Sequence, residues 1–113
     1  YDMQKGDSMA ERIKLQDYDE KVINKPLPVL VDFYSDSCVP CKRLAPVIGT
    51  VEDEKAGELA VFKVNINFDA DAAEKYEVSA VPTLVLFNGG EEKARHTGIF
   101  KKDELVSFIE ANA

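Results

Sequence analysis

The sequence predicts an α/β domain in which helices pack on a single sheet. Short apolar strands alternate with segments of helical periodicity along the chain, a pattern that favours parallel crossovers within one sheet. The length of 113 residues fits one domain, and no run of Pro, Gly or Ser is long enough for an interdomain linker. In the last third a turn signal precedes a polar strand, which predicts a hairpin at the sheet edge.

The first half of the chain is expected to supply two strands and two helices. A short strand is predicted at residues 12–15. A helix is predicted over 17–23, because an aspartate opens that segment and a glutamate follows three positions later. Residues 28–34 are almost continuously apolar, which is typical of a central strand covered on both faces. Apolar residues at helical spacing then predict a helix from about 38 to 55.

The second half continues the alternation of strands and helices. Apolar strands are expected at 60–66 and 81–87, and helices at 70–76 and 102–112. An Asn-Gly-Gly turn follows the second of these strands and leads into a more polar strand at 91–97. This last pair of strands forms the predicted edge hairpin.

The charge balance limits the classes of partner. The chain has 14 Lys and Arg against 21 Asp and Glu, a formal net charge of -7. Such an acidic chain lacks the basic surface that binds phosphate backbones or anionic lipids, so no nucleic acid and no membrane is expected among its partners. The apolar runs are also far shorter than the roughly 20 residues that a membrane-spanning helix needs.

The first eight residues are polar and contain no apolar segment of the kind found in a signal peptide. Met9 is a candidate natural start, so we interpret residues 1–8 as an N-terminal extension or cloning remnant and residues 9–113 as the domain. A stub left by signal cleavage would have the same sequence character, and an exported protein therefore stays an alternative.

Cys38 and Cys41 are the two cysteines of the chain. A disulfide between them would close a loop too short to restrain the unfolded chain, so a chemical role is expected. They lie where the central strand ends and a helix begins, and the free N–H groups and dipole there are expected to lower the pKa of a thiol. Cys38, at the very start, is expected to attack, and the more shielded Cys41 to resolve the mixed disulfide.

Two charged residues interrupt apolar strands. Asp32 lies in the central strand, and Lys63 lies in the strand at 60–66. Burial raises the pKa of a carboxyl and a nearby ammonium lowers it, so this pair is a candidate for holding Asp32 near neutrality as a proton acceptor. The alternatives are a structural ion pair and a strand with one solvated face.

Several sequence blocks, taken together, resemble the thioredoxin family. In chain order they are VLVDF at 29–33, CVPCK at 38–42, AP at 45–46, KVN at 63–65, VPTL at 81–84, and Gly98. The resemblance covers the chain from about residue 12 to 113. It implies the thioredoxin fold, a single three-layer α/β/α domain with a central mixed five-stranded sheet flanked by four helices.

The resemblance also implies site residues. The implied catalytic residues are Cys38, Cys41, Asp32 and Lys63. Asp32 would assist deprotonation of Cys41, with Lys63 as its partner. The implied substrate groove is lined by Val39, Pro40, Val81, Pro82, Gly98 and Ile99. Pro82 matches the family's cis-proline, and Val81 would offer backbone groups to an extended substrate segment by strand addition.

The activity implied by the resemblance is thiol-disulfide exchange, most of all general reduction of protein disulfides by the Cys38–Cys41 dithiol. No bound cofactor is expected, because the redox-active disulfide carries the electrons and NADPH acts only through a reductase. The implied partners are a thioredoxin reductase and disulfide-containing proteins. The implied state is a monomer in the cytoplasm.

The chain departs from the family pattern in ways that keep other functions open. It has Tyr34 and Ser37 where the family usually has tryptophans, and Val39 where glycine usually follows the first cysteine. The alternatives are a specialised electron donor, or a disulfide oxidant or isomerase, with a narrowed choice of partners. A binding module without turnover is an alternative of another class. No metal is expected, because zinc needs four ligands and two chains would have to share Cys38 and Cys41.

Overall fold

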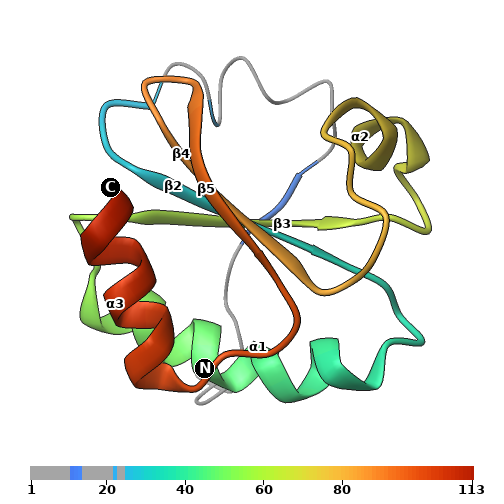
Figure 1. Ribbon diagram of the computed structural model, residues 1–113, viewed down its shortest axis with the longest axis horizontal. Helices are drawn as coiled ribbons and strands as arrows, with labels where there is room; N and C mark the ends of the chain where they lie inside the picture. Colours follow the sequence, from blue (N-terminus) through green and yellow to red (C-terminus); the bar gives the residue numbers. More distant parts are fainter. Residues whose placement is uncertain (1–10, 14–21, 23–24) are drawn as a thin grey trace.

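The computed structural model describes residues 11–13, 22 and 25–113, and within them a five-stranded mixed sheet crosses the molecule (Figure 1). The strands are β1 (Glu11–Arg12), β2 (Val29–Tyr34), β3 (Ala60–Asn65), β4 (Thr83–Asn88) and β5 (Glu91–Thr97). Their order is β1-β3-β2-β4-β5, so the apolar strand β2 lies in the middle. β3 runs parallel to β1 and β2, whereas β4 runs antiparallel to β2 and β5. The predicted α/β class and edge hairpin are therefore confirmed.

The described helices are α1 (Val39–Glu54), α2 (Ala70–Lys75) and α3 (Lys102–Asn112). Each agrees with its predicted segment to within one residue at either end. The sequence predicts a fourth helix over 17–23, but of those residues the structure describes only Val22, which is buried. The extension predicted at 1–8 also lies outside the described residues. None of the described helices has the length and apolar content of a membrane span.

Two strands differ from their predicted segments by more than one residue, whereas β2, β3 and β5 agree to within one residue at either end. The strand expected at 12–15 is described only as Glu11–Arg12, and residues 14–15 lie outside the described part of the chain. The strand expected to begin at residue 81 begins at Thr83, so that predicted start is wrong. Pro82 has no N–H to donate to a neighbouring strand, and the hydrogen-bonded ladder therefore starts after it.

The sheet separates two apolar cores, because successive side chains of a strand point to opposite faces. One core packs α1 and α3 on the sheet, and its buried members include Leu30, Leu44, Ile48, Leu84 and Leu105. The other core includes the single buried residue of α2, and among its members are Val31, Phe33, Val64, Ala72 and Val85. Figure 1 shows α1 and α3 on one face of the sheet and α2 on the other, which confirms the three-layer arrangement.

One row of side chains across the sheet bears on the site. Strand pairing places Asp32 of β2 beside Lys63 of β3, and Lys63 beside Arg12 of β1. Leu84 of β4 lies on the other side of Asp32. Asp32 shares the face of Leu30, two residues before it, against which α1 packs. α1 therefore faces a row that contains one carboxylate and two cations.

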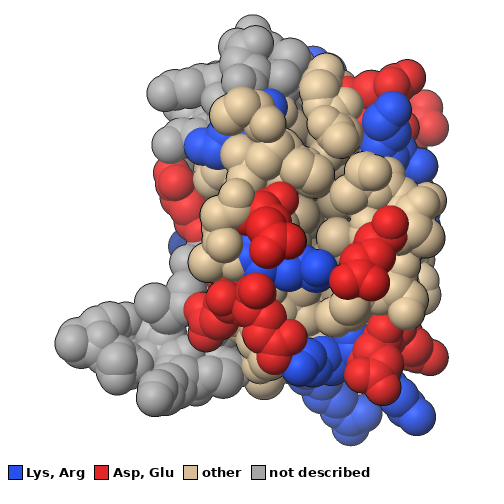
Figure 2. All heavy atoms as spheres, turned by 90° about the vertical axis from the view of Figure 1, so that its left-hand side faces the viewer, with Lys and Arg blue, Asp and Glu red and all other residues tan. Residues whose placement is uncertain are grey.

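Charged side chains of both signs lie together on the surface. Lys55 donates to Glu110 at 3.3 Å, and Lys102 forms an ion pair with Glu54. Both contacts join the C-terminal end of α1 to α3. Figure 2 shows acidic and basic side chains interleaved across one face of the molecule. The described charges on this face are thus of both signs.

Candidate active site

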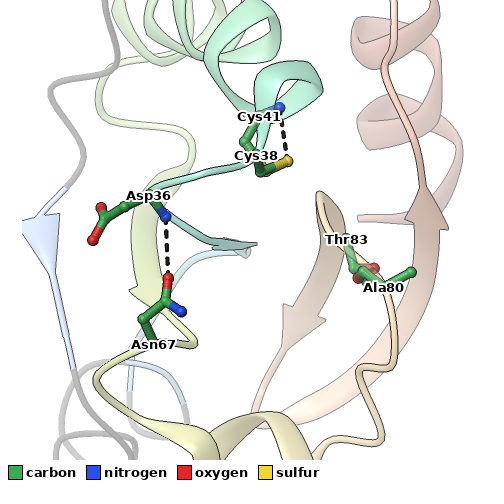
Figure 3. The surroundings of a disulfide bond; sticks show 6 residues. All are labelled: Asp36, Cys38, Cys41, Asn67, Ala80 and Thr83. Carbon is green, nitrogen blue, oxygen red and sulfur yellow. Dashed lines mark hydrogen bonds between the residues drawn. A yellow bond between two sulfur atoms is a disulfide. The ribbon is translucent and has the colours of Figure 1, made fainter.

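The two cysteines lie where β2 passes into α1. A disulfide joins Cys38 to Cys41, with their Cα atoms 5.2 Å apart. Figure 3 shows both on the first turn of α1, across from the segment that carries Ala80 and Thr83 at the start of β4. The strand order brings these two segments together, because β2 and β4 are neighbours in the sheet.

Cys38 is the N-cap of α1. Its backbone is extended, and its Sγ accepts a hydrogen bond from the Cys41 backbone N–H at 3.1 Å. Pro40 is accommodated because backbone N–H groups in the first turn have no partner inside the helix. The same free N–H groups and the helix dipole stabilise negative charge on the Cys38 sulfur when the disulfide is reduced. Cys41 is only 7% exposed, whereas Cys38 is half-buried. The two sulfurs therefore differ in access.

Asp32 lies in a pocket next to Cys41. The pocket has a volume of about 190 Å³, and its lining includes Asp32, Tyr34, Cys41, Lys42 and Lys63. The Asp32 side chain is 5% exposed, and its Oδ1 has no hydrogen-bond partner. Burial raises the pKa of Asp32 from 3.8 to about 7, and the charge of Lys63 acts in the opposite direction. Asp32 is therefore a carboxyl group that can gain or lose a proton near neutral pH.

Lys63 faces Asp32 in the sheet without forming an ion pair with it. The two residues are register partners, yet the ammonium of Lys63 lies over the Tyr34 ring, 4.8 Å from its centroid. The guanidinium carbon of Arg12 lies 6.0 Å from the same centroid. Sequence reasoning identified Asp32 and Lys63 because they interrupt apolar strands. No comparable sequence pattern predicts the contact of Lys63 with Tyr34.

The second wall of the site is formed by the segments before β4 and after β5. The Val81–Pro82 peptide bond is cis, as the sequence resemblance implies. The Gly98 N–H donates to the Pro82 carbonyl at 2.9 Å. Gly98 has a φ of +107°, a conformation that L side chains rarely adopt. Ile99 follows it and is 51% exposed.

Val39 and Pro40 form the exposed rim on the other side of the dithiol. Val39 is 58% exposed and lies directly after Cys38, and Pro40 is also exposed. The structure thus brings the catalytic residues predicted from the sequence to one end of the sheet. The predicted groove residues lie on the cysteine turn and on the two segments beside β4.

Comparison with known proteins decides the family. The family model described as Thioredoxin matches residues 9–111. The chain belongs to the thioredoxin family. It is 39% identical to a thioredoxin of Allochromatium vinosum over 95 residues, which cover 84% of this chain and 89% of that protein. It is 34% identical to a thioredoxin of Rickettsia bellii over 104 residues, which cover 92% of this chain and 99% of that protein.

Membership of the thioredoxin family shows the general chemistry. A thioredoxin of Pseudomonas aeruginosa is also 39% identical over 95 residues, covering 84% of this chain and 88% of that protein. The chain is a thiol-disulfide oxidoreductase that acts as a protein-disulfide reductase, and its redox group is the Cys38–Cys41 disulfide. Within residues 11–13, 22 and 25–113, no group of three His, Cys, Asp or Glu is arranged to hold a metal ion.

A hydrogen-bond network beside Cys38 and Cys41 was not predicted from the sequence. The Asp36 N–H donates to Asn67 Oδ1 at 3.2 Å (Figure 3). Asn65 Nδ2 donates to Asp36 Oδ1 at 3.0 Å. Asn65 Oδ1 in turn accepts from the Asn67 N–H at 2.9 Å. The network ties the loop before Cys38 to the loop after β3. The network joins loops that are far apart in sequence, so no local sequence pattern points to it.

Thr83 is a further residue of the site whose role sequence reasoning did not assign. Its hydroxyl donates to the Ala80 carbonyl at 2.7 Å and hydrogen-bonds with the Thr97 hydroxyl at 3.0 Å. The buried hydroxyl therefore holds the segment before β4 in place and links it to β5.

Proposed function

We propose that the protein is a general reductant of protein disulfides in which Cys38 is the nucleophile and Cys41 the resolving thiol. One observation carries this assignment of roles. The Cys38 sulfur accepts a backbone N–H at the start of α1, and Cys41 lies buried one turn further along. The more accessible sulfur is therefore also the one whose negative charge the helix stabilises.

The proposed reaction begins with attack of the Cys38 thiolate on one sulfur of a substrate disulfide. The substrate S–S bond breaks, one substrate sulfur leaves as a thiolate, and a mixed disulfide with Cys38 forms. The Cys41 sulfur then attacks the Cys38 sulfur, which releases the second substrate sulfur and closes the Cys38–Cys41 disulfide. Two electrons pass from the dithiol to the substrate, which gains two protons.

Asp32 is proposed to accept the proton of Cys41 before the resolving step. Both residues line the pocket of about 190 Å³, which has room for water between them. A pKa of about 7 lets Asp32 bind this proton and release it again near neutral pH. Lys63 belongs to the same pocket as a nearby positive charge that favours ionised Asp32.

Substrates are proposed to bind as extended segments along Val81. The residue before Pro82 lies outside β4, so its backbone groups are not committed to the sheet ladder by a strand partner. Strand addition would use those groups for main-chain hydrogen bonds. Val39 and Ile99, both exposed and apolar, would contact the side chains of the substrate.

The exposed isopropyl group of Val39 favours a second candidate function, that of a specialised electron donor with a narrowed choice of protein partners. It lies immediately after the attacking cysteine, where a bulky substrate segment would meet it. Replacement of Val39 by glycine tests this candidate. A broadened range of reduced substrates would support it, and an unchanged range would contradict it.

The partner and location assignments are part of the proposal. We propose that an NADPH-dependent thioredoxin reductase reduces the Cys38–Cys41 disulfide, and that the protein works as a cytoplasmic monomer. Family membership supports the reductase. Coupled NADPH oxidation with a thioredoxin reductase, light scattering and cell fractionation measure these three properties separately.

Trapping of the mixed disulfide tests the roles of the cysteines. With Cys41→Ser, a disulfide-containing protein such as insulin should remain covalently attached to Cys38 on a non-reducing gel. With Cys38→Ser, no adduct should accumulate, and insulin reduction by dithiothreitol should be no faster than without protein. An adduct that forms through Cys41 in the Cys38→Ser variant would overturn the assignment.

A further inference from the structure

The position of the Lys63 ammonium is unexpected for a lysine beside a buried carboxylate. Lys63 and Asp32 are direct register partners on neighbouring parallel strands. Neighbouring strands lie about 4.8 Å apart, so a lysine can reach a carboxylate beside it. Yet Asp32 Oδ1 has no hydrogen-bond partner, and no ion pair joins the two described side chains. Some other group must therefore hold the ammonium.

The ring of Tyr34 is that group. Tyr34 lies two residues after Asp32 on β2, so both side chains share one face of the sheet. The ammonium of Lys63 lies 4.8 Å from the ring centroid, inside the range of a cation–π contact. Partial burial strengthens such a contact, because the cation is then less hydrated. The aromatic face and the Asp32 carboxylate thus compete for one cation.

Arg12 is a second cation near the Tyr34 ring. It is the register partner of Lys63 on β1, and like charges directly opposite one another on paired strands are destabilising. Its guanidinium carbon lies 6.0 Å from the Tyr34 ring centroid, so one ring faces both cations. The electron-rich face of Tyr34 offsets their repulsion and keeps Lys63 where it is.

We propose that Tyr34 is a positioning residue, whose ring holds the Lys63 ammonium away from Asp32 and so sets the charge balance in the pocket beside Cys41. The inference rests on the proposed role of Asp32 as a proton acceptor. If Lys63 paired directly with Asp32, the carboxylate would be locked in its ionised form. With Lys63 on Tyr34, Asp32 can exchange a proton with Cys41 near neutral pH.

The other charged and titratable groups around the pocket come from each element that borders it. They are Arg12 on β1, Lys63 on β3, Asp36 in the loop after β2, and Cys41 and Lys42 on α1. β4 contributes the apolar Leu84 beside Asp32. Of the two cations of the row, Lys63 is the one beside Asp32, whereas Arg12 lies a strand further away.

The proposal is tested by NMR titration of the Asp32 carboxyl in the oxidised protein, in which neither cysteine titrates. Tyr34→Leu removes the ring and should let Lys63 pair with Asp32, which lowers the pKa of Asp32 by about one unit or more. Tyr34→Phe is the matched control, because it keeps the aromatic face and removes only the hydroxyl. The pKa of Asp32 in Tyr34→Phe should equal that of the wild type.

A double-mutant cycle with Lys63→Met separates the proposed effect from simple entry of water. Lys63→Met alone should raise the pKa of Asp32, and Tyr34→Leu should add no further shift in that background. The proposal is overturned by a Tyr34→Leu shift that persists without Lys63, by no shift in Tyr34→Leu, or by an equal shift in Tyr34→Phe. Tyr34→Met, which keeps more volume, replaces Tyr34→Leu if thermal unfolding shows that Tyr34→Leu does not fold.

The titration is independent of the role of Asp32 in the reaction. Asp32→Asn tests that role by the rate of mixed-disulfide resolution. An unchanged rate would end the proton-acceptor proposal, even if Tyr34 sets the pKa of Asp32 as proposed.

Discussion

Asp32 is the residue at which stability and chemistry conflict most directly. Its carboxyl is buried, and one of its oxygens has no hydrogen-bond partner. Burial of a charge without a close partner is destabilising, so ionised Asp32 lowers the free energy of unfolding. The proposed proton acceptor therefore weakens the domain that contains it.

We expect Asp32→Asn to stabilise the protein in a pH-dependent way. The pKa of Asp32 is about 7 in the folded protein, whereas its ordinary value is 3.8, so the folded state holds a proton that the unfolded state has lost between these pH values. Wild-type stability must then fall as the pH rises from about 4 to 7. The gain from Asp32→Asn should be small at pH 4 and reach at most about 4 kcal/mol above pH 7.

Urea unfolding at several pH values measures this gain. Asp53→Asn, an exposed carboxyl on α1, is the matched control and should give a small difference at every pH. A gain from Asp32→Asn that is constant between pH 4 and 8 would contradict the raised pKa of Asp32.

At this scale the sequence alone was informative where a residue breaks a local pattern. Asp32 and Lys63 could be predicted because charges in apolar strands are rare and need a reason. The two cysteines could be predicted because a two-residue spacing at a helix start has few structural uses. The position of the Lys63 ammonium over the Tyr34 ring could not be predicted. It depends on strand register and on the competition between the Asp32 carboxylate and the Tyr34 ring for one cation.

At the scale of elements, the dithiol turn depends on two neighbouring loops. Asn65 and Asn67 hold Asp36 on one side, and Thr83 holds the segment before Pro82 on the other. α1 itself fixes the cysteines only relative to its own first turn. These side-chain hydrogen bonds hold the loop before the turn and the segment before β4, which borders the proposed substrate groove.

We expect Asn65→Ala to loosen the loop before Cys38. The variant loses the bond to Asp36 and leaves the Asn67 N–H without its acceptor, so the free energy of unfolding should fall by about 1–3 kcal/mol. Amide hydrogen exchange should speed up in residues 35–38 more than in α3. Asn112→Ala, which removes one bond at the end of α3, is the control. Equal exchange in residues 35–38 of both variants would show that the network does not hold the loop.

We expect Thr83→Val to weaken substrate binding more than it weakens the attack by Cys38. Valine keeps the shape of threonine but removes the hydroxyl bonded to Ala80 and Thr97. The free energy of unfolding should fall by about 1–3 kcal/mol, because the two partner groups lose a buried bond. Steady-state kinetics with insulin should show a raised KM with a smaller change in kcat. A lowered kcat at constant KM would contradict a role in the groove.

The elements themselves were largely predictable, and the reason is that their signals are local. The bounds of α1 and α3 follow from the helical spacing of apolar residues within single segments. The start of β4 was misplaced because apolar content continues through Val81 while Pro82 cannot join the ladder. The Asp36, Asn65 and Asn67 network joins loops that are far apart in sequence, and no local pattern encodes it.

At the scale of the whole molecule, stability resides in the two cores rather than in the charged surface. The ion pairs between α1 and α3 involve partly exposed side chains, and such pairs contribute little. Ile48, in contrast, is fully buried between α1 and the sheet. The exposed charges of the described residues therefore contribute little to the stability of the fold.

We expect Ile48→Ala to cost about 2–5 kcal/mol, through lost burial and the cavity that remains. Lys102→Met, which removes the ion pair with Glu54, should change the free energy of unfolding by less than about 1 kcal/mol. Chemical denaturation of the two variants in low and high salt measures the difference. If the free energy of unfolding falls as much in Lys102→Met as in Ile48→Ala, stability does not reside mainly in the cores.

The overall class was predictable because alternation of strands and helices leaves few ways to bury both faces of a sheet. The strand order was not predicted from the sequence. Periodicity shows that β2 is buried on both faces, but it does not show which two strands pair with it.

That strand order also has a consequence for how the chain is made. β2 lies between β3 and β4, and the wall opposite the dithiol is completed only by β4 and β5, which come late in the sequence. A ribosome therefore delivers both thiols well before the strands that border their groove. Until β4 emerges, the central strand of the nascent chain has one free edge, and Cys38 lacks the wall that faces it in the finished molecule.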